Sequence, residues 1–195
     1  MVRYVDPELD PELPKRQCQA VGERLARWRE KNAALRGSEA FEAAREVALR
    51  RLDRHSCTEE ELRTAIVTRG FSQDLAQQVV CRLVEVGLVN DRHYAEAFVR
   101  DRFSLSGKTG RALSQDLQRR GISQELIHQA LDQIGDEDQE ERARELVRKK
   151  IATFHGVSRD TAYRRLTSLL ARKGYSAHIC VSVVSEILTS YEEEE

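Results

Sequence analysis

"RRGISQEL", at residues 119–126, is a short corner that occurs three times in this chain of 195 residues. "TRGFSQDL" at 68–75 and "RKGYSAHI" at 172–179 are the other copies, and the glycines of successive copies stand 51 and 53 residues apart. Each copy has a glycine, then a large apolar residue, then a serine. A corner repeated at a nearly constant interval is typical of tandem structural repeats.

The residues of the corner indicate the end of one helix and the start of the next. Glycine tolerates the left-handed conformation that often follows a helix. A serine two positions later can accept a hydrogen bond from a free N–H of the next helix. The residues concerned are Gly70, Gly121 and Gly174, with Ser72, Ser123 and Ser176. We therefore expect a helix-turn-helix corner in every copy.

Apolar residues keep the same positions around each corner. A leucine stands eight residues before each glycine, and a leucine or isoleucine thirteen residues after it, as in Leu113 and Ile134. A third amphipathic stretch precedes each pair, and no proline follows Pro14. We predict an all-α fold of three tandem three-helix, helix-turn-helix-like repeats that form an elongated curved array.

The predicted repeats span residues 39–89, 90–135 and 136–190. The stretches "VVCRLVEVGLV" and "ICVSVVSEIL" are rich in β-branched residues, but their counterpart in the middle repeat has helical periodicity, so all three should be helices. We expect residues 1–38 to form a flexible extension with a possible helix from 15 to 36, and residues 191–195 to form an acidic tail.

Composition excludes several classes of protein. Apolar residues make up 40% of the chain and charged residues 33%, which is typical of a globular protein with a charged surface. No apolar run approaches the roughly 18 residues of a membrane span, and no signal peptide is evident, so we expect a cytoplasmic protein without a membrane partner. The scattered cysteines and histidines have no metal-ligand spacing, and we expect no metal or other cofactor.

One stretch, "SGKTG" at residues 106–110, invites comparison with a phosphate-binding loop. Such a loop would need glycine where Arg102 stands, and it would follow a strand instead of an amphipathic helix. A flexible basic loop between helices is the better interpretation. Without any other catalytic arrangement, we expect that the chain is not an enzyme.

The net charge of −1 conceals two basic regions. Residues 142–173 have ten positive and two negative side chains, and residues 100–120 have six and two. Such clusters attract polyanions through counterion release, although solvated helix faces are the simpler alternative. The candidate binding residues are Arg100, Arg102, Lys108, Arg111, Arg119, Arg120, Arg148, Lys149, Lys150, Arg164, Arg165 and Lys173.

The repeated corner is also similar to a DNA-reading helix-turn-helix. The helices after the corners begin "SQDLAQQVV", "SQELIHQAL" and "SAHICVSVV", without an arginine near their starts that could reach guanine edges. Base-specific reading is therefore weakly indicated. A tandem helix-turn-helix module that binds nucleic acid without another protein remains the alternative function.

Two adjoining stretches resemble a known family. "VGLVNDRHYAEAFVRDR" at 86–102, followed by "GRALSQDLQRRGIS" at 110–123, is similar to the bacterial RecX regulators of the RecA recombinase. The motif residues that match include Gly87, Leu88, Asp91, Tyr94, Ala95 and Gly121. The resemblance extends over roughly residues 41–188, and Asn90 departs from the family's usual aspartate.

The resemblance implies a non-enzymatic modulator, mainly an inhibitor, of RecA. Such a protein binds the RecA filament on single-stranded DNA and suppresses its ATPase, strand-exchange and coprotease activities. Its partners would be RecA, the filament and possibly DNA directly, and we expect a monomer. We would place a central filament contact at Arg100, Arg102, Lys108 and Arg111, and a second contact with RecA or DNA phosphate at Arg148, Lys149, Lys150, Arg164 and Arg165.

Overall fold

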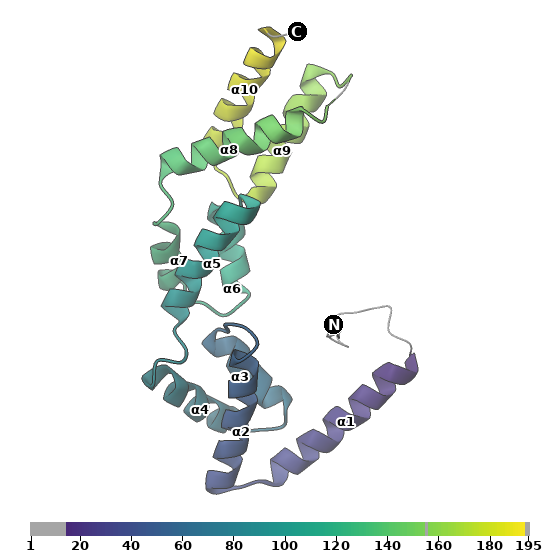
Figure 1. Ribbon diagram of the computed structural model, residues 1–195, viewed down its shortest axis with the longest axis vertical. Coiled ribbons are helices and arrows are strands. Elements are labelled where there is room, and N and C mark those ends of the chain that lie inside the picture. The colour runs from purple at the N-terminus through teal and green to yellow at the C-terminus, as the bar shows by residue number, and fades with distance from the viewer. Residues whose placement is uncertain (1–14, 155, 194–195) are drawn as a thin grey trace. The chain divides into compact units, whose positions relative to one another are not determined.

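The structure is a computed structural model that describes residues 15–154 and 156–193, with side chains described for 22–154 and 156–190. Every regular element in these residues is an α-helix (Figure 1). The all-α prediction is confirmed, and both β-branched stretches are helical. The predicted flexibility of the first fourteen residues and the end of the acidic tail lie outside the described residues.

The helices follow one another with short connections. They are α1 (Lys15–Ala34), α2 (Gly37–Leu52), α3 (Glu59–Thr68), α4 (Gln73–Glu85), α5 (Asp91–Ser106), α6 (Gly110–Gln118), α7 (Gln124–Leu131), α8 (Asp136–Ile151), α9 (Arg159–Lys173) and α10 (Ala177–Glu193). Helices α2–α4, α5–α7 and α8–α10 make three groups of three, so the three-helix repeats are confirmed. None of the described helices is long and apolar enough to cross a membrane.

The chain divides into two compact units, one with α1–α4 that ends at Asn90, and one with α5–α10 that begins at Asp91. Each unit is described by itself, and the curved array of all three repeats stays a prediction. In the first unit, the core lies between α2, α3 and α4 around the fully buried Leu62, Ile66 and Val79. Ala44 and Ala48 of α2 are also fully buried, and their small side chains let α2 approach the other two helices closely.

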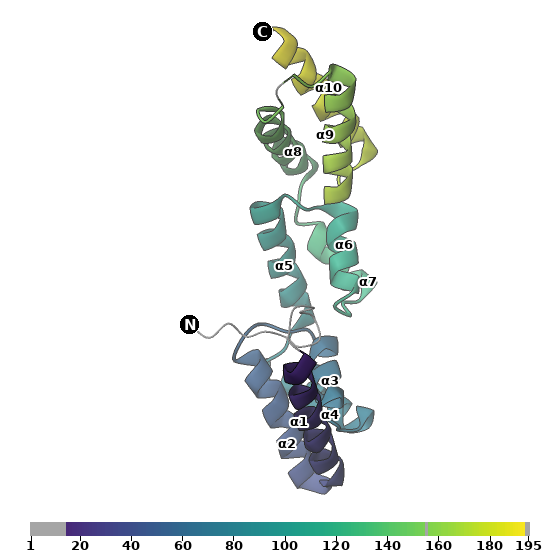
Figure 2. The same ribbon diagram turned by 90° about the vertical axis from the view of Figure 1, so that its right-hand side faces the viewer.

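The second unit has two cores, one for each repeat. Leu113, Leu117 and Ile127 are fully buried in the core of α5–α7. In the last repeat, α10 packs along both α8 and α9 (Figure 2), and Leu166 and Leu170 of α9 are fully buried there. Each repeat therefore buries an apolar face of its own helices.

The three corners have the predicted geometry. Their glycines are in the left-handed region, with φ of 95° at Gly70, 80° at Gly121 and 97° at Gly174. Each corner serine caps the following helix. Its hydroxyl accepts a hydrogen bond from the backbone N–H three residues later, over 3.3, 3.4 and 3.2 Å in the three repeats. Helix α3 begins with a capping box, formed between Thr58 and Glu61.

The possible helix near the N-terminus is present as α1, and its end is attached to the first corner. Arg29 Nε donates to the carbonyl of Thr68, and Asn32 Nδ2 donates to the carbonyl of Arg69, both over 2.8 Å. A Cβ at Gly70 would stand 2.7 Å from the backbone of Arg29. The last carbonyl groups of a helix have no hydrogen-bond partners within that helix. Side chains at the end of α1 thus supply donors to the carbonyl groups at the end of α3.

Contrary to the prediction of a flexible loop, the "SGKTG" stretch is packed between the second and third repeats. Thr109 is only 1% exposed, and its N–H donates to the carbonyl of Lys173 over 2.8 Å. Its hydroxyl donates to Gln139 Oε1 over 3.2 Å. Lys173 Nζ donates to the carbonyl of Ser106. These bonds hold the two repeats of the second unit together.

Helix α5 begins at a carboxylate. Asp91 is the first residue of the helix. Its carboxylate is well placed, because negative charge in the first turn interacts favourably with the helix dipole.

We predict that Gly174→Ala destabilises the second unit by about 3 kcal/mol. A Cβ at Gly174 would stand 2.0 Å from the carbonyl oxygen of Thr109, in addition to the strain of a φ of 97°. Gly156→Ala is the matched control, since Gly156 also has a positive φ but nothing within 4 Å of the added Cβ. It should cost only about 1–2 kcal/mol. Urea unfolding of the two variants measures the difference, and equal losses would contradict the close approach.

Candidate functional site

A basic pocket lies on the surface of the third repeat, between the end of α8 and the exposed face of α9. Its volume is about 550 Å³. The residues that line it are Lys150, Phe154, Thr161, Arg164, Arg165, Ser168, Leu169 and Arg172. Four of these side chains are cations, two carry hydroxyl groups and none is a carboxylate, so the pocket is suited to an anion.

The periodicity of α9 directs these cations outward. Arg164, Ser168 and Arg172 recur every four residues, which places them on one face of the helix. Leu166 and Leu170 belong to the opposite face and are fully buried in the core. One face of α9 therefore packs in the core of the repeat, and the opposite face forms one wall of the pocket.

An aromatic ring lies beside two of the charged groups. Phe154 packs partly against the core of the third repeat. Lys150 Nζ lies 5.7 Å and Arg165 Cζ 5.9 Å from the centroid of its ring, within the range of cation–π attraction. The ring thus keeps two of the four cations close to each other without neutralising them.

The other two cations are oriented by neutral groups. Arg164 Nε donates to the carbonyl of Asp160 over 3.3 Å, and Arg172 donates to Ser168 Oγ over 2.9 Å. Among the described residues, no carboxylate forms an ion pair with any of the four pocket cations. Their charge is therefore available to a ligand.

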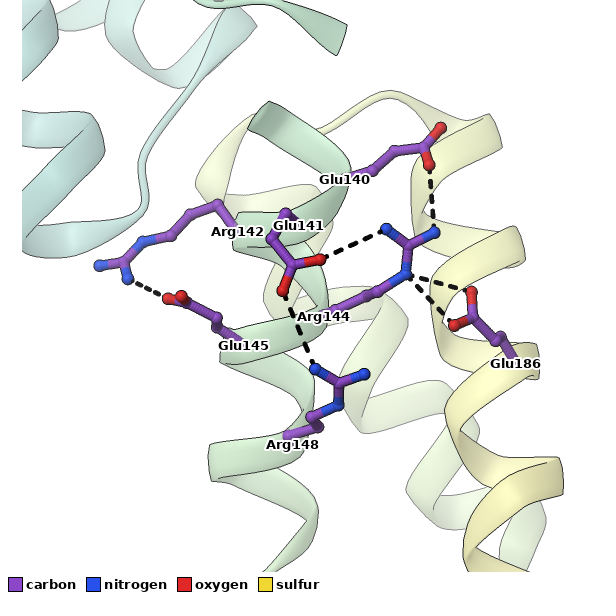
Figure 3. Close-up of polar contacts among 7 residues, drawn as sticks. All are labelled: Glu140, Glu141, Arg142, Arg144, Glu145, Arg148 and Glu186. Atoms are coloured by element: carbon purple, nitrogen blue, oxygen red, sulfur yellow. Dashed lines mark hydrogen bonds and ion pairs between the residues drawn. The ribbon is translucent and has the colours of Figure 1, made fainter. Parts of the chain in front are cut away.

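Other arginines of the same region are compensated by carboxylates (Figure 3). Arg144 contacts Glu140 at 3.2 Å, Glu141 at 3.8 Å and Glu186 of α10 at 3.2 Å. Hydrogen bonding to Glu186 raises the pKa of Arg144, against the opposing effect of burial. Counting charges along the chain therefore overstates the positive field of this region.

Two predicted contact residues lie outside the pocket. Arg148 is 3.9 Å from Glu141 (Figure 3), and it does not line the pocket. Lys149 is exposed but does not line it either. Lys150, Arg164 and Arg165 are the members of the predicted second patch that the structure brings together.

Sequence reasoning selected only Lys150, Arg164 and Arg165 of the residues that line the pocket, and it missed Arg172 and Phe154 in particular. The signal for Arg172 was its place eight residues after Arg164, which puts both on one helix face. No comparable pattern distinguishes Phe154, because its role depends on how α8 and α9 pack.

A second basic surface lies on the middle repeat. Tyr94 and Phe98 of α5 are stacked, with ring centroids 6.1 Å apart and an interplanar angle of 16°. Arg102 Cζ lies 5.3 Å from the centroid of the Phe98 ring, and Arg120 Cζ lies 5.2 Å from the same centroid. Both rings also pack against the core of this repeat. Arginine and aromatic residues thus form one continuous surface.

The remaining predicted cations of the middle repeat divide into two groups. Arg100 and Arg111 are exposed. Lys108 Nζ contacts Asp116 Oδ2 at 2.7 Å, and Arg119 forms an ion pair with the other carboxylate oxygen. Burial raises the pKa of Asp116, but the hydrogen bonds and charges of these two cations outweigh it, so the pKa lies below its usual value.

Lys173, another predicted contact residue, has a structural place between the repeats. It is half-buried and holds the carbonyl of Ser106. Burial lowers the pKa of Lys173, and the positive charges of Arg142 and Lys108 lower it further. The half-buried position of Lys173 therefore fits a bond between the repeats better than contact with a ligand.

Three family models match successive parts of the chain: the first three-helix domain of RecX at residues 44–83, the second at 90–131 and the third at 136–184. The chain is 36% identical over 159 residues to the regulatory protein RecX of Amycolatopsis mediterranei, which covers 82% of this chain and 91% of that protein. The chain belongs to the RecX family.

Other RecX proteins agree with this assignment. The regulatory protein RecX of Streptomyces coelicolor is 39% identical over 147 residues, covering 75% of this chain and 78% of that protein. The crystal structure of RecX from Lactobacillus salivarius superposes with a TM-score of 0.69 at 23% identity, covering 75% of this chain and 95% of that chain. This structural likeness supports the fold.

The RecX motif residues connect the first two repeats. Gly87 has a φ of 74° and ends α4, and the next residue, Leu88, is 55% exposed. Val89 is buried in the core of the first repeat, whereas Ala95 is fully buried in the core of the second. Most of the motif is thus explained by the turn and by packing, but nothing in the structure explains the exposed leucine.

We predict that Asp116→Asn lowers the free energy of unfolding at pH 7 by about 1 kcal/mol, because the charged pairs with Lys108 and Arg119 are lost. The folded-state pKa of Asp116 is below the value of about 3.9 in an unfolded chain. The carboxylate therefore stabilises the fold above that pH, and the contribution disappears as the pH falls through the folded-state pKa. Denaturation of both proteins from pH 7 to pH 3 should show the difference shrinking, and a constant difference would refute this role.

Proposed function

We propose that this chain modulates the RecA recombinase, mainly as an inhibitor. It binds the RecA filament on single-stranded DNA and suppresses ATP hydrolysis, strand exchange and coprotease activity. The observation that carries this proposal is the match to RecX proteins across all three repeats. In this role it has no catalytic reaction or cofactor of its own and acts as a cytoplasmic monomer.

The two basic surfaces of the second unit are the proposed filament contacts. The first combines the exposed Arg100, Arg102 and Arg111 with the ring-stacked Arg120 of the middle repeat, and the second is the basic pocket of the third repeat. Hydrogen bonds at Thr109 hold these repeats together. Binding at one surface therefore raises the effective concentration of the other at a neighbouring site on the filament.

The alternative is a tandem helix-turn-helix module that binds nucleic acid without RecA. In such modules the helix after the corner enters the major groove. In the third repeat that helix is α10, but the residues that line the basic pocket come from α8, α9 and the segment between them. The arrangement favours contact with a backbone or a protein surface over reading of bases in a duplex.

We predict that Arg164→Glu/Arg165→Glu raises the concentration needed for half-maximal inhibition of RecA by about tenfold or more, because two charge-assisted contacts become repulsive. Both side chains are exposed, so the variant should keep the wild-type helical content and melting temperature. ATP hydrolysis by the cognate RecA on single-stranded DNA measures inhibition. Arg24→Glu/Lys31→Glu is the matched control, because it reverses two exposed charges of α1 in the other unit and should inhibit as well as the wild type.

Two results would contradict the proposal at different levels. Full inhibition by the folded Arg164→Glu/Arg165→Glu variant would remove the basic pocket from the mechanism. If the folded wild-type protein leaves RecA activity unchanged at every ratio, modulation of RecA is excluded, and the nucleic-acid module takes its place.

A further inference from the structure

The composition of the basic pocket distinguishes among the anions that could fill it. Guanidinium groups donate two hydrogen bonds in a fork that matches phosphate oxygens, and hydroxyl groups such as those of Thr161 and Ser168 add further donors. A carboxylate-rich peptide would also be attracted by the four cations. The carboxylates of such a peptide, however, would gain nothing from contact with the Phe154 ring and the Leu169 side chain, which also line the pocket.

The cations on α9 are spread over a length greater than the spacing of successive nucleotides in a strand. Arg164 and Arg172 are eight residues apart on the same face, which corresponds to about 12 Å along the helix axis. This is several times the roughly 3.4 Å rise per nucleotide of a stacked strand. The two arginines can therefore hold different phosphates of one strand.

Phe154 offers an aromatic surface for stacking, which a phosphate group alone does not need. Bases of single strands stack on aromatic rings and on the planes of arginine guanidinium groups. Phe154 with Arg165, 5.9 Å from its ring centroid, supplies both kinds of surface beside the phosphate donors. In a duplex the bases are already stacked on one another and cannot reach such a ring.

We propose that the basic pocket of the third repeat is a binding site for single-stranded nucleic acid. Arg164 and Arg172 hold successive parts of its phosphate backbone, and Phe154 with Arg165 stacks a base. This assignment rests on the proposed function, because it names the component of the filament that the pocket contacts. It can nevertheless be tested without RecA.

The test is fluorescence anisotropy of a labelled 20-nucleotide oligothymidylate titrated with the full chain at several salt concentrations. The wild type should bind it, and Arg164→Gln/Arg172→Gln should weaken binding by at least about tenfold. The slope of log K against log salt should become shallower by about 1.4, from two phosphate contacts at about 0.7 each. The matched control, Arg24→Gln/Lys31→Gln, removes two exposed charges of α1 and should bind within about twofold of the wild type.

Phe154→Leu tests stacking separately from charge. It should weaken binding by about fivefold or more and leave the salt slope unchanged. Circular dichroism shows whether this variant is folded, since Phe154 packs partly against the core. If it is not folded, Arg165→Gln keeps the ring and removes the guanidinium plane, and it should weaken binding together with a shallower slope.

Competitors distinguish the classes of ligand. A duplex of the same length and a polyglutamate of equal charge should each displace the labelled strand at least about tenfold less well than unlabelled oligothymidylate. Inorganic pyrophosphate should compete only weakly, because it has no base to stack. Equal competition by polyglutamate would overturn the proposal in favour of an acidic protein, and equal competition by duplex would overturn the role of stacking.

Comparison with the RecA assay separates this proposal from the broader function. If Arg164→Gln/Arg172→Gln keeps oligothymidylate binding but loses inhibition, the nucleic-acid site is wrong and the filament function stands. If the variant loses oligothymidylate binding and the wild type does not inhibit RecA, the site stands and the filament function is wrong.

Discussion

The corner between the second and third helices of each repeat is the constraint on which the rest of the structure depends. Its glycine must be in the left-handed region, and in two repeats its surroundings also leave no space for a side chain. At Gly70 the neighbour is the backbone of Arg29 in α1, and at Gly174 it is the backbone of Thr109 in the preceding repeat. One residue thus ends a helix, turns the chain and lets another segment approach.

That close approach determines how the basic surfaces are presented. The contact of Thr109 with the end of α9 joins the middle and last repeats through a backbone hydrogen bond to the carbonyl of Lys173. Lys173 helps to maintain this junction and Lys108 is paired with Asp116 within the middle repeat, whereas Arg164 and Arg172 have neither role. Positive residues in one region of the chain therefore differ in their surroundings: Lys173 is half-buried between the repeats, and Arg164 and Arg172 are exposed at the pocket.

The distribution of carboxylates adds a second distinction. The first turns of α8 are acidic, and Glu140 and Glu141, together with Glu186 of α10, compensate the arginines that follow them. On the face of α9 that lines the pocket, Asp160 precedes Arg164 by one turn, but its carboxylate forms no ion pair with the four pocket cations among the described residues. Exposed ion pairs contribute little to stability. The main effect of the pairs on α8 is therefore to neutralise some arginines and leave others to produce positive potential. Positive potential remains at the pocket, beside Phe154, which is the only aromatic residue among those that line it.

The sequence by itself determined the repeat, the all-helical fold, the corners and the family. The first three depend on local properties, namely the conformational freedom of glycine, the capping capacity of serine and the 3.6-residue period of apolar side chains, whereas the family was indicated by the resemblance of the motif residues. It also indicated Lys150, Arg164 and Arg165 as candidate contacts. Only the tertiary structure decided that Arg148 faces a carboxylate, that the "SGKTG" stretch is packed between two repeats, and that Phe154 stands beside cations. Pairing and burial depend on side chains that are distant in sequence, and no local pattern records which helix packs against which.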